Sequence, residues 1–369
     1  MQQTIFFFLN VVIIFEVVTP KTANSMETWR NLRRVKRELD KIPLHKFGLG
    51  RYTVLVHIGS NQQPFRLVLA TASSLVWVPL KSAAATWSEH NLYDPDASES
   101  SSLRNTPLVV GSGDISLNGK LFEDRIKLGH FTIENFVFGA AEEVTGYPVQ
   151  DTFDGVFGMA LRTTREGADH TILDCLFQLN FIQHREFGLF FREATEGRSY
   201  MVIGKNARQY MPEEAYPVQI LNGPLWTIQV DWMFLGGVPF NLYGYKAIVD
   251  TGATAIYVPP DILETINSIL EVSESVGGFN TVDCSKVGRL PALDFQGVNV
   301  KLSIYSSQYI LQGNVDGVRR CYSPFLPHSE SKVILLGISV LHAFDLLFSA
   351  DPGYVVFGTK QFQSSAIPV

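Results

Sequence analysis

Short runs of β-branched and aromatic residues, separated by Gly, Pro, Ser and Asn, recur along most of the chain, and this pattern predicts β-strands. The clearest runs are residues 51–59, 66–72, 73–79, 246–252 and 354–358. Residues 108–121 read LVVGSGDISLNGKL and predict a hairpin near Gly111. Helical spacing is clear only in residues 168–182 and 259–270. The sequence therefore predicts an all-β protein with few short helices.

Two segments 180 residues apart match position by position. Residues 68–79 read VLATASSLVWVP, and residues 248–259 read IVDTGATAIYVP. A second pair follows them, FDGVFG ending at Gly158 and VILLG ending at Gly337. One repeat of about half the chain indicates a duplication into two related lobes facing each other across a cleft, because solenoid repeats have much shorter periods.

The first residues form an apolar run, IFFFLNVVIIFEVV, which is too short to span a membrane. It is interpreted as a secretory signal peptide of residues 1–25, since Ala23 and Ser25 place small residues before a cleavage site at Met26. The alternative is an N-terminal strand. No other stretch is long and apolar enough for a membrane span, so a secretory signal would imply an exported protein without one.

The segment that follows differs from the rest of the chain in charge. Residues 26–51 carry eight Lys or Arg against three Asp or Glu, whereas the whole chain has a net charge of −6. Trp29, Leu32, Val35 and Leu39 recur at helical spacing within it. Two interpretations stay open: a solvated charged helix, or a basic prosegment of residues 26–46 on an acidic body.

Composition excludes several classes of protein. With 46% hydrophobic residues the chain can bury a substantial core, and its acidic body lacks the basic stripe of a nucleic-acid binder. Three cysteines are too few for a disulfide-built scaffold, and the histidines show no metal-binding spacing. No metal, cofactor or nucleic-acid partner is expected. Cys175, on an apolar helical face with Ile172, Leu176 and Leu179, is predicted to be a free, buried thiol.

From about Phe47 onward these landmarks resemble the pepsin-like aspartic proteases. The motifs that carry the resemblance are TASSLVWVP, HNLYDPDASESSS, VVGSGD and FDGVFGMA, then WTIQVDWM, IVDTGATAIYVP and LLGISVLHAFDLLFS. The resemblance implies an N-terminal lobe of residues 47–205 and a C-terminal lobe of residues 206–369. It further implies a monomer with a hairpin flap over an extended peptide, a prosegment that blocks the cleft, and a disulfide between Cys284 and Cys321. An exported member would be secreted or reside in the lysosomal or endosomal lumen.

Proteolysis in that family needs two carboxylates that share one proton, because like charges so close cannot both ionise. One activates water and the other hydrogen-bonds the scissile carbonyl, so neither suffices alone. By the repeat, the partner of Asp250 is Ala70. The resemblance marks three further departures, Ala72 for Gly, Val110 for the flap Tyr, and Ala253 for a small hydroxyl residue.

Other positions of the motif are kept. Thr71 and Thr251 imply hydrogen bonds between the lobes, and the remaining cleft positions are Ser73, Trp77, Gly111 and Gly252. Three functions follow as hypotheses. The first is a catalytically inactive member that binds a peptide or protein in the old cleft. The alternatives are a weak or atypical aspartic endopeptidase and a decoy that binds protease inhibitors.

Overall fold

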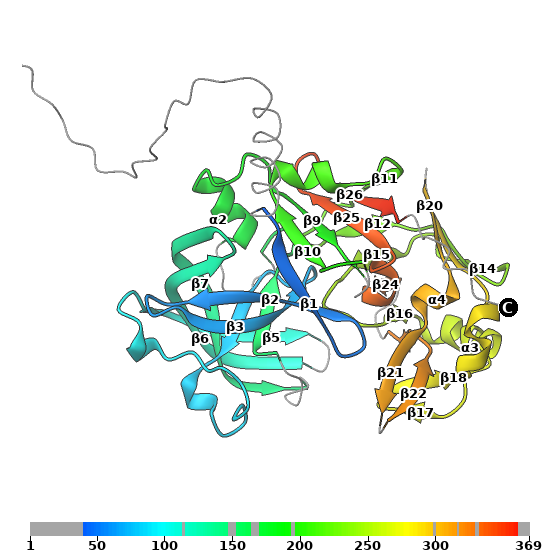
Figure 1. Ribbon diagram of the computed structural model, residues 1–369, viewed down its shortest axis with the longest axis horizontal. Coiled ribbons are helices and arrows are strands. Elements are labelled where there is room, and N and C mark those ends of the chain that lie inside the picture. Colours follow the sequence, from blue (N-terminus) through cyan, green and yellow to red (C-terminus); the bar gives the residue numbers. More distant parts are fainter. Residues whose placement is uncertain are drawn as a thin grey trace, which may run out of the picture. The chain divides into compact units, whose positions relative to one another are not determined.

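The computed structural model describes residues 40–360 apart from 113–114, 147–152, 164–169, 193–195, 298–299, 316 and 329–331. The proposed signal peptide and most of the basic segment lie outside the described residues. The described part consists mainly of β-strands with short helices between them (Figure 1). The predicted all-β class is therefore confirmed.

The main sheet contains 13 strands from both halves of the chain. Their bounds are β1 (Ile42–Phe47), β2 (Arg51–Ile58), β3 (Gln63–Ala70), β4 (Val76–Pro79), β5 (Ser102–Ser112), β6 (Ile115–Leu128), β7 (Phe131–Thr145), β8 (Gly155–Gly158), β9 (Glu186–Phe190), β10 (Tyr200–Ile203), β11 (Ala215–Gln219), β25 (Phe344–Ser349) and β26 (Tyr354–Thr359). They lie in the order β11-β26-β25-β9-β10-β1-β2-β3-β8-β4-β7-β6-β5. Because β9 pairs with β25, backbone hydrogen bonds join the two halves.

Three smaller sheets come from the second half of the chain. Their strands are β12 (Thr227–Gln229), β13 (Trp232–Leu235), β14 (Val238–Asn241), β15 (Lys246–Val249), β16 (Ile256–Val258), β17 (Ser275–Val276), β18 (Phe279–Val282), β19 (Leu293–Gly297), β20 (Val300–Ile304), β21 (Leu311–Val315), β22 (Val318–Tyr322), β23 (Phe325–Pro327) and β24 (Val333–Leu336). One sheet has the order β12-β15-β24-β16-β23, and the others are β14-β13-β19-β20 and β17-β18-β22-β21.

The helices are short. They are α2 (Ile172–Gln178), α3 (Pro260–Ile269), α4 (Ser306–Tyr309) and α5 (Ile338–Leu341), with 3₁₀ turns η1 (Lys81–Ala83), η2 (Pro95–Ala97), η3 (Lys205–Tyr210) and η4 (Cys284–Arg289). The helix expected within residues 259–270 is α3, which begins on Pro260 and buries Ile262 and Ile266. Within the described ranges, none of the helices combines the length and the apolar character needed to cross a membrane.

The helix expected within residues 168–182 is also present, but its buried face differs from the prediction. α2 starts at a capping box in which Thr171 and Asp174 bond each other's backbone N–H. Ile172 and Leu176 are buried as expected, whereas Leu179 is 51% exposed. The helix ends at Gln178, so Leu179 no longer follows the helical face that the spacing assumed.

The internal repeat is visible as one strand arrangement used twice. In the first half, β8 pairs in parallel with β3 and antiparallel with β4, and β4 pairs in parallel with β7. In the second half, β24 pairs in parallel with β15 and antiparallel with β16, and β16 pairs in parallel with β23. The matching sequences therefore form matching structures, and each places a loop directly after β3 or β15.

The apolar side chains form one main core and two smaller clusters, one of which lies beside the hairpin of β5 and β6. This flap-side cluster comprises Ala70, Leu75, Trp77, Ala83, Trp87, Leu108, Leu117, Leu121, Ala141, Val144 and Val156. Strand alternation explains it, because Leu108 and Leu117 point inward from the hairpin while their neighbours do not. The cluster connects the hairpin to the end of β3.

The strand β1 crosses the proposed boundary between a prosegment ending at residue 46 and a lobe beginning at residue 47. It pairs with β2 on one side and β10 on the other. Ile42 and Leu44 are buried in the main core, and Asn206 Nδ2 donates to Asp40 Oδ2 at 2.9 Å. Residues from Asp40 onward are therefore integral to the folded body.

Candidate functional site

The loops that follow β3 and β15 are bonded to each other through two threonines. Thr71 Oγ1 donates to the carbonyl oxygen of Val249 at 2.6 Å, and Thr251 Oγ1 donates to that of Leu69 at 2.7 Å. The backbone N–H of Thr251 also donates to Thr71 Oγ1 at 3.0 Å. Both threonines are almost completely buried. These cross-loop Thr bonds, which the resemblance implied, hold the two repeats together at one point.

At this point Gly252 lies beside both Ala70 and the Asp250 carboxyl. A Cβ built on Gly252 would lie 2.8 Å from the Cβ of Ala70 and 3.2 Å from Asp250 Oδ1. The backbone N–H of Gly252 donates to Asp250 Oδ1 at 2.8 Å. The end of β3 thus presents a methyl group to the loop that carries the carboxyl of Asp250.

The surroundings of Asp250 favour its protonated form. Burial is the main influence and raises the pKa of Asp250 above its ordinary value, while backbone N–H groups of Gly252, Ala72 and Ala253 lower it. This differs from the shared proton of a two-carboxylate site, where one acid shifts the other. Ala72 therefore contributes a backbone contact to the carboxyl even though its side chain departs from the family motif.

Each loop passes under a glycine where β8 or β24 ends. A Cβ on Gly158 would lie 2.5 Å from the carbonyl oxygen of Leu75, and one on Gly337 would lie 2.1 Å from that of Ala255. Real Cβ atoms do not approach a backbone oxygen so closely, so both positions need glycine for clearance. Ser73 lies within the first loop, where the N–H of Leu75 donates to its Oγ at 3.3 Å.

The hairpin of β5 and β6 is the element that the sequence predicted near Gly111. Val110 pairs with Leu117, and Gly111 with Ser116. Val110 is half-buried and packs on the flap-side cluster, which contains both Ala70 and Trp77. Trp77 is buried and meets Trp87 edge to face, with ring centroids 6.1 Å apart. Apolar contacts therefore occupy the position where the resemblance implies a Tyr hydroxyl.

Sequence reasoning missed Tyr257, although the repeat aligns it with Trp77. Tyr257 is half-buried on β16. Burial raises its pKa, the charge of Asp250 raises it further, and Arg51 acts in the opposite direction. The phenol is therefore a neighbour of the Asp250 carboxyl. The repeat aligns Tyr257 with Trp77, so it does point to this position. Because both residues are aromatic, the alignment does not mark the position as polar.

Two sequence landmarks of the first half prove to be structural supports. In FDG, the buried Asp154 accepts from the backbone N–H groups of Arg66 at 2.8 Å and Asn91 at 3.0 Å. Phe153 is almost fully buried and packs on Phe47. The turn thus ties β3 to the loop before η2.

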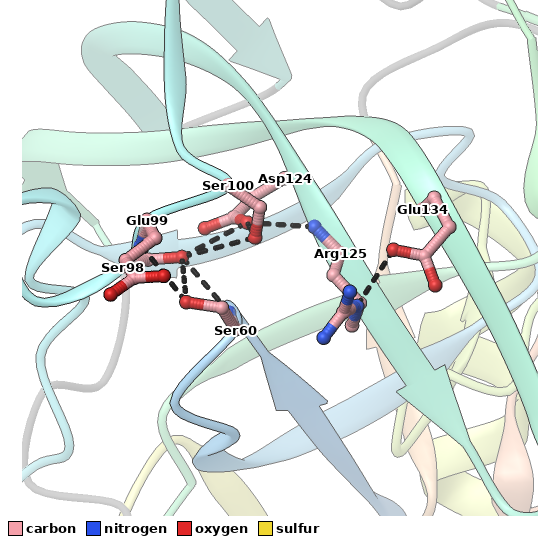
Figure 2. Close-up of polar contacts among 7 residues, drawn as sticks. All are labelled: Ser60, Ser98, Glu99, Ser100, Asp124, Arg125 and Glu134. Carbon is pink, nitrogen blue, oxygen red and sulfur yellow. Dashed lines mark hydrogen bonds and ion pairs between the residues drawn. The ribbon is translucent and has the colours of Figure 1, made fainter.

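Side chains of the serine-rich motif HNLYDPDASESSS donate hydrogen bonds to the fully buried Asp124. Its carboxylate accepts from Ser100 Oγ at 2.6 Å and Ser98 Oγ at 3.1 Å (Figure 2). It also accepts from Tyr93 Oη at 2.7 Å. The N–H of Arg125 also donates to it at 2.8 Å. Burial is the main reason that the pKa of Tyr93 is raised. Asp124 is therefore a satisfied structural acid and lies outside the candidate site.

The cysteines largely follow the expectation. Cys284 and Cys321 form a disulfide with 5.3 Å between their Cα atoms, which confirms the pairing. Cys175 is free but only half-buried, which corrects the prediction of a buried thiol. It lies on α2, where it is packed against the main core. Burial nevertheless raises the pKa of its thiol to about 11, so it is a poor nucleophile.

A cavity of about 830 Å³ lies elsewhere and contains none of the predicted site residues. It is lined by Arg192, Glu196, Pro212, Glu213, Glu214, Asp345, Thr359 and Lys360. Arg192 and Asp345 already form a two-pronged ion pair within it. In the part of the chain that is described, no three His, Cys, Asp or Glu side chains gather in position to hold a metal ion.

Comparison with known proteins identifies the family. The family model for eukaryotic aspartyl proteases matches residues 51–359. Pepsin A of Rhinolophus ferrumequinum is 26% identical over 313 residues, covering 83% of this chain and 80% of that protein. Probable vacuolar protease A of Trichophyton verrucosum is also 26% identical over 313 residues, covering 83% and 77%. Pepsin A of Sus scrofa is 25% identical over 313 residues, covering 83% and 80%. The chain belongs to the eukaryotic aspartyl protease family.

Proposed function

We propose that this protein is a pepsin-like family member that has lost proteolytic activity and retains a cleft that binds a peptide or protein segment. The observation that supports this proposal is the methyl group of Ala70 opposite Asp250. Hydrolysis in this family needs an ionised and a protonated carboxyl at one point. A single carboxyl whose pKa is raised by burial has no partner to complete that pair.

The remainder of the site supports retained binding. The cross-loop Thr bonds, the two glycines Gly158 and Gly337 that give the loops room, and the hairpin of β5 and β6 are all present. Extended peptides gain affinity from backbone hydrogen bonds and side-chain pockets along a groove, and neither source requires a second carboxylate. The proposal therefore separates the binding framework, which is kept, from the reacting centre, which is not.

The wider proposal follows the resemblance. The signal peptide of residues 1–25 would direct a monomer into the secretory route, to the exterior or to the lysosomal or endosomal lumen. The relatives named as pepsin A and vacuolar protease A are consistent with such compartments. The Cys284–Cys321 disulfide supports an oxidising one.

The test is a digestion assay of recombinant protein with a denatured protein substrate between pH 2 and 6. No pepstatin-sensitive cleavage is expected, because losing one member of a catalytic unit costs several powers of ten in rate. Pepstatin-sensitive turnover that disappears in Asp250→Asn would instead establish the atypical endopeptidase. Binding of protein protease inhibitors without binding of extended peptides would favour the decoy function.

A further inference from the structure

A second cavity, of about 340 Å³, lies in the first half of the chain. It is lined by Gly59, Gln62, Arg125, Lys127, Thr132 and Glu134. None of these residues belongs to the candidate site described above. Their charged side chains are two cations and one carboxylate, although the whole chain has a net charge of −6. This local excess of positive charge favours an anionic ligand.

Strand pairing places Lys127 and Thr132 on one face of the main sheet. Lys127 of β6 pairs directly with Thr132 of β7, and residues opposite each other in antiparallel strands share a face. Among the residues that the structure describes, no carboxylate forms an ion pair with Lys127. The cavity therefore offers an ammonium group beside a hydroxyl group.

A β-bulge brings Glu134 beside Arg125. The ladder of β6 and β7 shifts register between Asp124 and Ile126. At this shift Arg125 opposes two residues of β7, Glu134 and Asn135. Bulges redirect side chains and are common next to active sites. Here Arg125 Nε donates to Glu134 Oε2 at 2.7 Å, which fixes the direction of the guanidinium.

Arg125 is held firmly at its backbone and keeps donors at the end of its side chain. Its N–H donates to Asp124 Oδ1 at 2.8 Å, and its carbonyl oxygen accepts from the N–H of Gly59 at 2.8 Å. The contact between Arg125 and Glu134 in Figure 2 reaches Nε alone. The two terminal nitrogens have no partner within the described part of the chain. A guanidinium bound through Nε can still present its terminal N–H groups to an oxyanion.

We propose that this cavity binds a phosphate group, either as free phosphate or as part of a small phosphate monoester. The terminal N–H groups of Arg125 would bind its oxygens, the ammonium group of Lys127 would balance its charge, and the Thr132 hydroxyl would donate to it. A monoester carries close to two negative charges and three acceptor oxygens at neutral pH, which matches two cations and a hydroxyl better than a carboxylate does. The site is independent of the proposed peptide binding.

The test measures anion binding to the purified protein by titration calorimetry at neutral pH and low ionic strength, where charge interactions are least screened. The probes are inorganic phosphate, glycerol 2-phosphate and acetate. Saturable binding of one phosphate probe per chain is expected, with acetate much weaker. Tighter binding of glycerol 2-phosphate identifies a monoester as the ligand, and tighter binding of inorganic phosphate identifies the free ion.

Four variants assign the binding to this cavity. Arg125→Met and Lys127→Met should each weaken the phosphate probes about ten- to a hundredfold, because each removes a charge-assisted contact. Arg125→Lys keeps the charge without the fork and should keep part of the affinity, which covers the case in which Arg125→Met does not fold. Glu134→Gln should tighten binding, because it removes the carboxylate that faces the anion and keeps an oxygen for Arg125 Nε.

Lys120→Met is the matched control. It makes the same change in net charge on the same strand, at a side chain that pairs with Glu142 and does not line the cavity. The affinity for phosphate should stay close to that of the wild type. Absence of saturable binding, acetate that binds as tightly as phosphate, or wild-type affinity in both Arg125→Met and Lys127→Met overturns the phosphate site. None of these outcomes affects the proposed peptide binding.

Discussion

The loops after β3 and β15 share a fold and differ in chemistry. Both follow the first strand of the same four-strand arrangement, both contribute a buried Thr to the cross-loop bonds, and both pass beneath a glycine. Yet β3 ends in Ala70 where β15 leads into Asp250, and Ala72 stands where the second loop has Gly252. The features that the two loops share, the buried Thr and the overlying glycine, support the backbone. The carboxyl group is present only in the second loop.

This difference separates two kinds of constraint. A buried Thr that satisfies backbone groups of the other loop is needed for the fold, because an orphaned buried carbonyl costs free energy of folding. A carboxyl that lies beside another carboxyl is costly and is useful only for chemistry. If a fold is kept only for binding, we expect the buried threonines to be retained and the catalytic carboxyl to be lost.

The comparison is tested most strongly by converting the first loop toward the second. We expect Ala70→Asp alone to restore little peptidase activity, because Ala72 and Val110 still occupy the positions where the family motif has Gly and the flap Tyr. Adding Ala72→Gly and Val110→Tyr should raise activity more than about a hundredfold over Ala70→Asp, since misplacement by about 1 Å can cost that much. Initial rates on a fluorogenic peptide at acid pH measure both.

The control for this series is Asp250→Asn in the triple variant, which should remove any activity gained. Family-like turnover from Ala70→Asp alone would show that Ala72 and Val110 do no damage. The side chain of Ala70 would then be the only difference that keeps the first loop from working in catalysis.

The second test addresses the clearance that the loops share. Gly158→Ala and Gly337→Ala should each destabilise the fold by more than about 4 kcal/mol, because the new Cβ would press on a backbone carbonyl. Gly337 has φ −84°, so the expected loss is steric and does not come from backbone strain. Thermal unfolding and soluble yield measure the effect.

Gly111→Ala is the matched control, because no atom other than its own and its chain neighbours' lies within 4 Å of a Cβ there. Its effect on stability should stay within about 0.5 kcal/mol. If only one of Gly158→Ala and Gly337→Ala were destabilising, the two loops would not be equivalent in packing.

The third test concerns an asymmetry within the cross-loop Thr bonds. Thr71 Oγ1 contacts two backbone groups of the second loop region, whereas Thr251 Oγ1 donates to one carbonyl. Each buried group left unpaired costs about 1–3 kcal/mol. Thr71→Val should therefore lower the free energy of unfolding more than Thr251→Val, as measured by urea denaturation. Equal losses would contradict this difference.

Local pattern predicted much of this protein, and its limits are physical. The repeat and the alternation of side chains predicted β3, β4, β15, β16 and the hairpin near Gly111, because those signals depend on neighbours in sequence. The pairing of β9 with β25 did not follow from any local signal, since it joins strands more than 150 residues apart. The pairing of β1 with β10 did not follow from a local signal either, because these strands are equally remote in sequence.

Errors at single residues have a similar origin. The face of α2 was extended to Leu179 because spacing does not reveal where a helix ends. Tyr257 was overlooked because its proximity to Asp250 depends on the turn between β15 and β16. Ala70, by contrast, was assigned from the repeat alone, because the second copy supplied its own reference.

The smallest expected effect concerns how stability depends on pH, and it isolates the carboxyl that only the second loop has. Burial raises the folded-state pKa of Asp250 above its unfolded value, so Asp250 binds a proton more tightly in the folded protein. Its contribution to stability is therefore fully present below the unfolded pKa of about 3.8 and is lost as pH rises through the folded pKa. Asp250→Asn mimics the protonated form and can still accept from the N–H of Gly252. Relative to wild type, this variant should become more stable as pH rises from about 3 to 7. Ala70→Ser, a neutral change at the facing position, should leave the pH dependence unchanged. Denaturation midpoints measured across this range decide the matter: a gap between Asp250→Asn and wild type that does not change with pH would mean that Asp250 is no harder to ionise in the folded protein than in the unfolded chain.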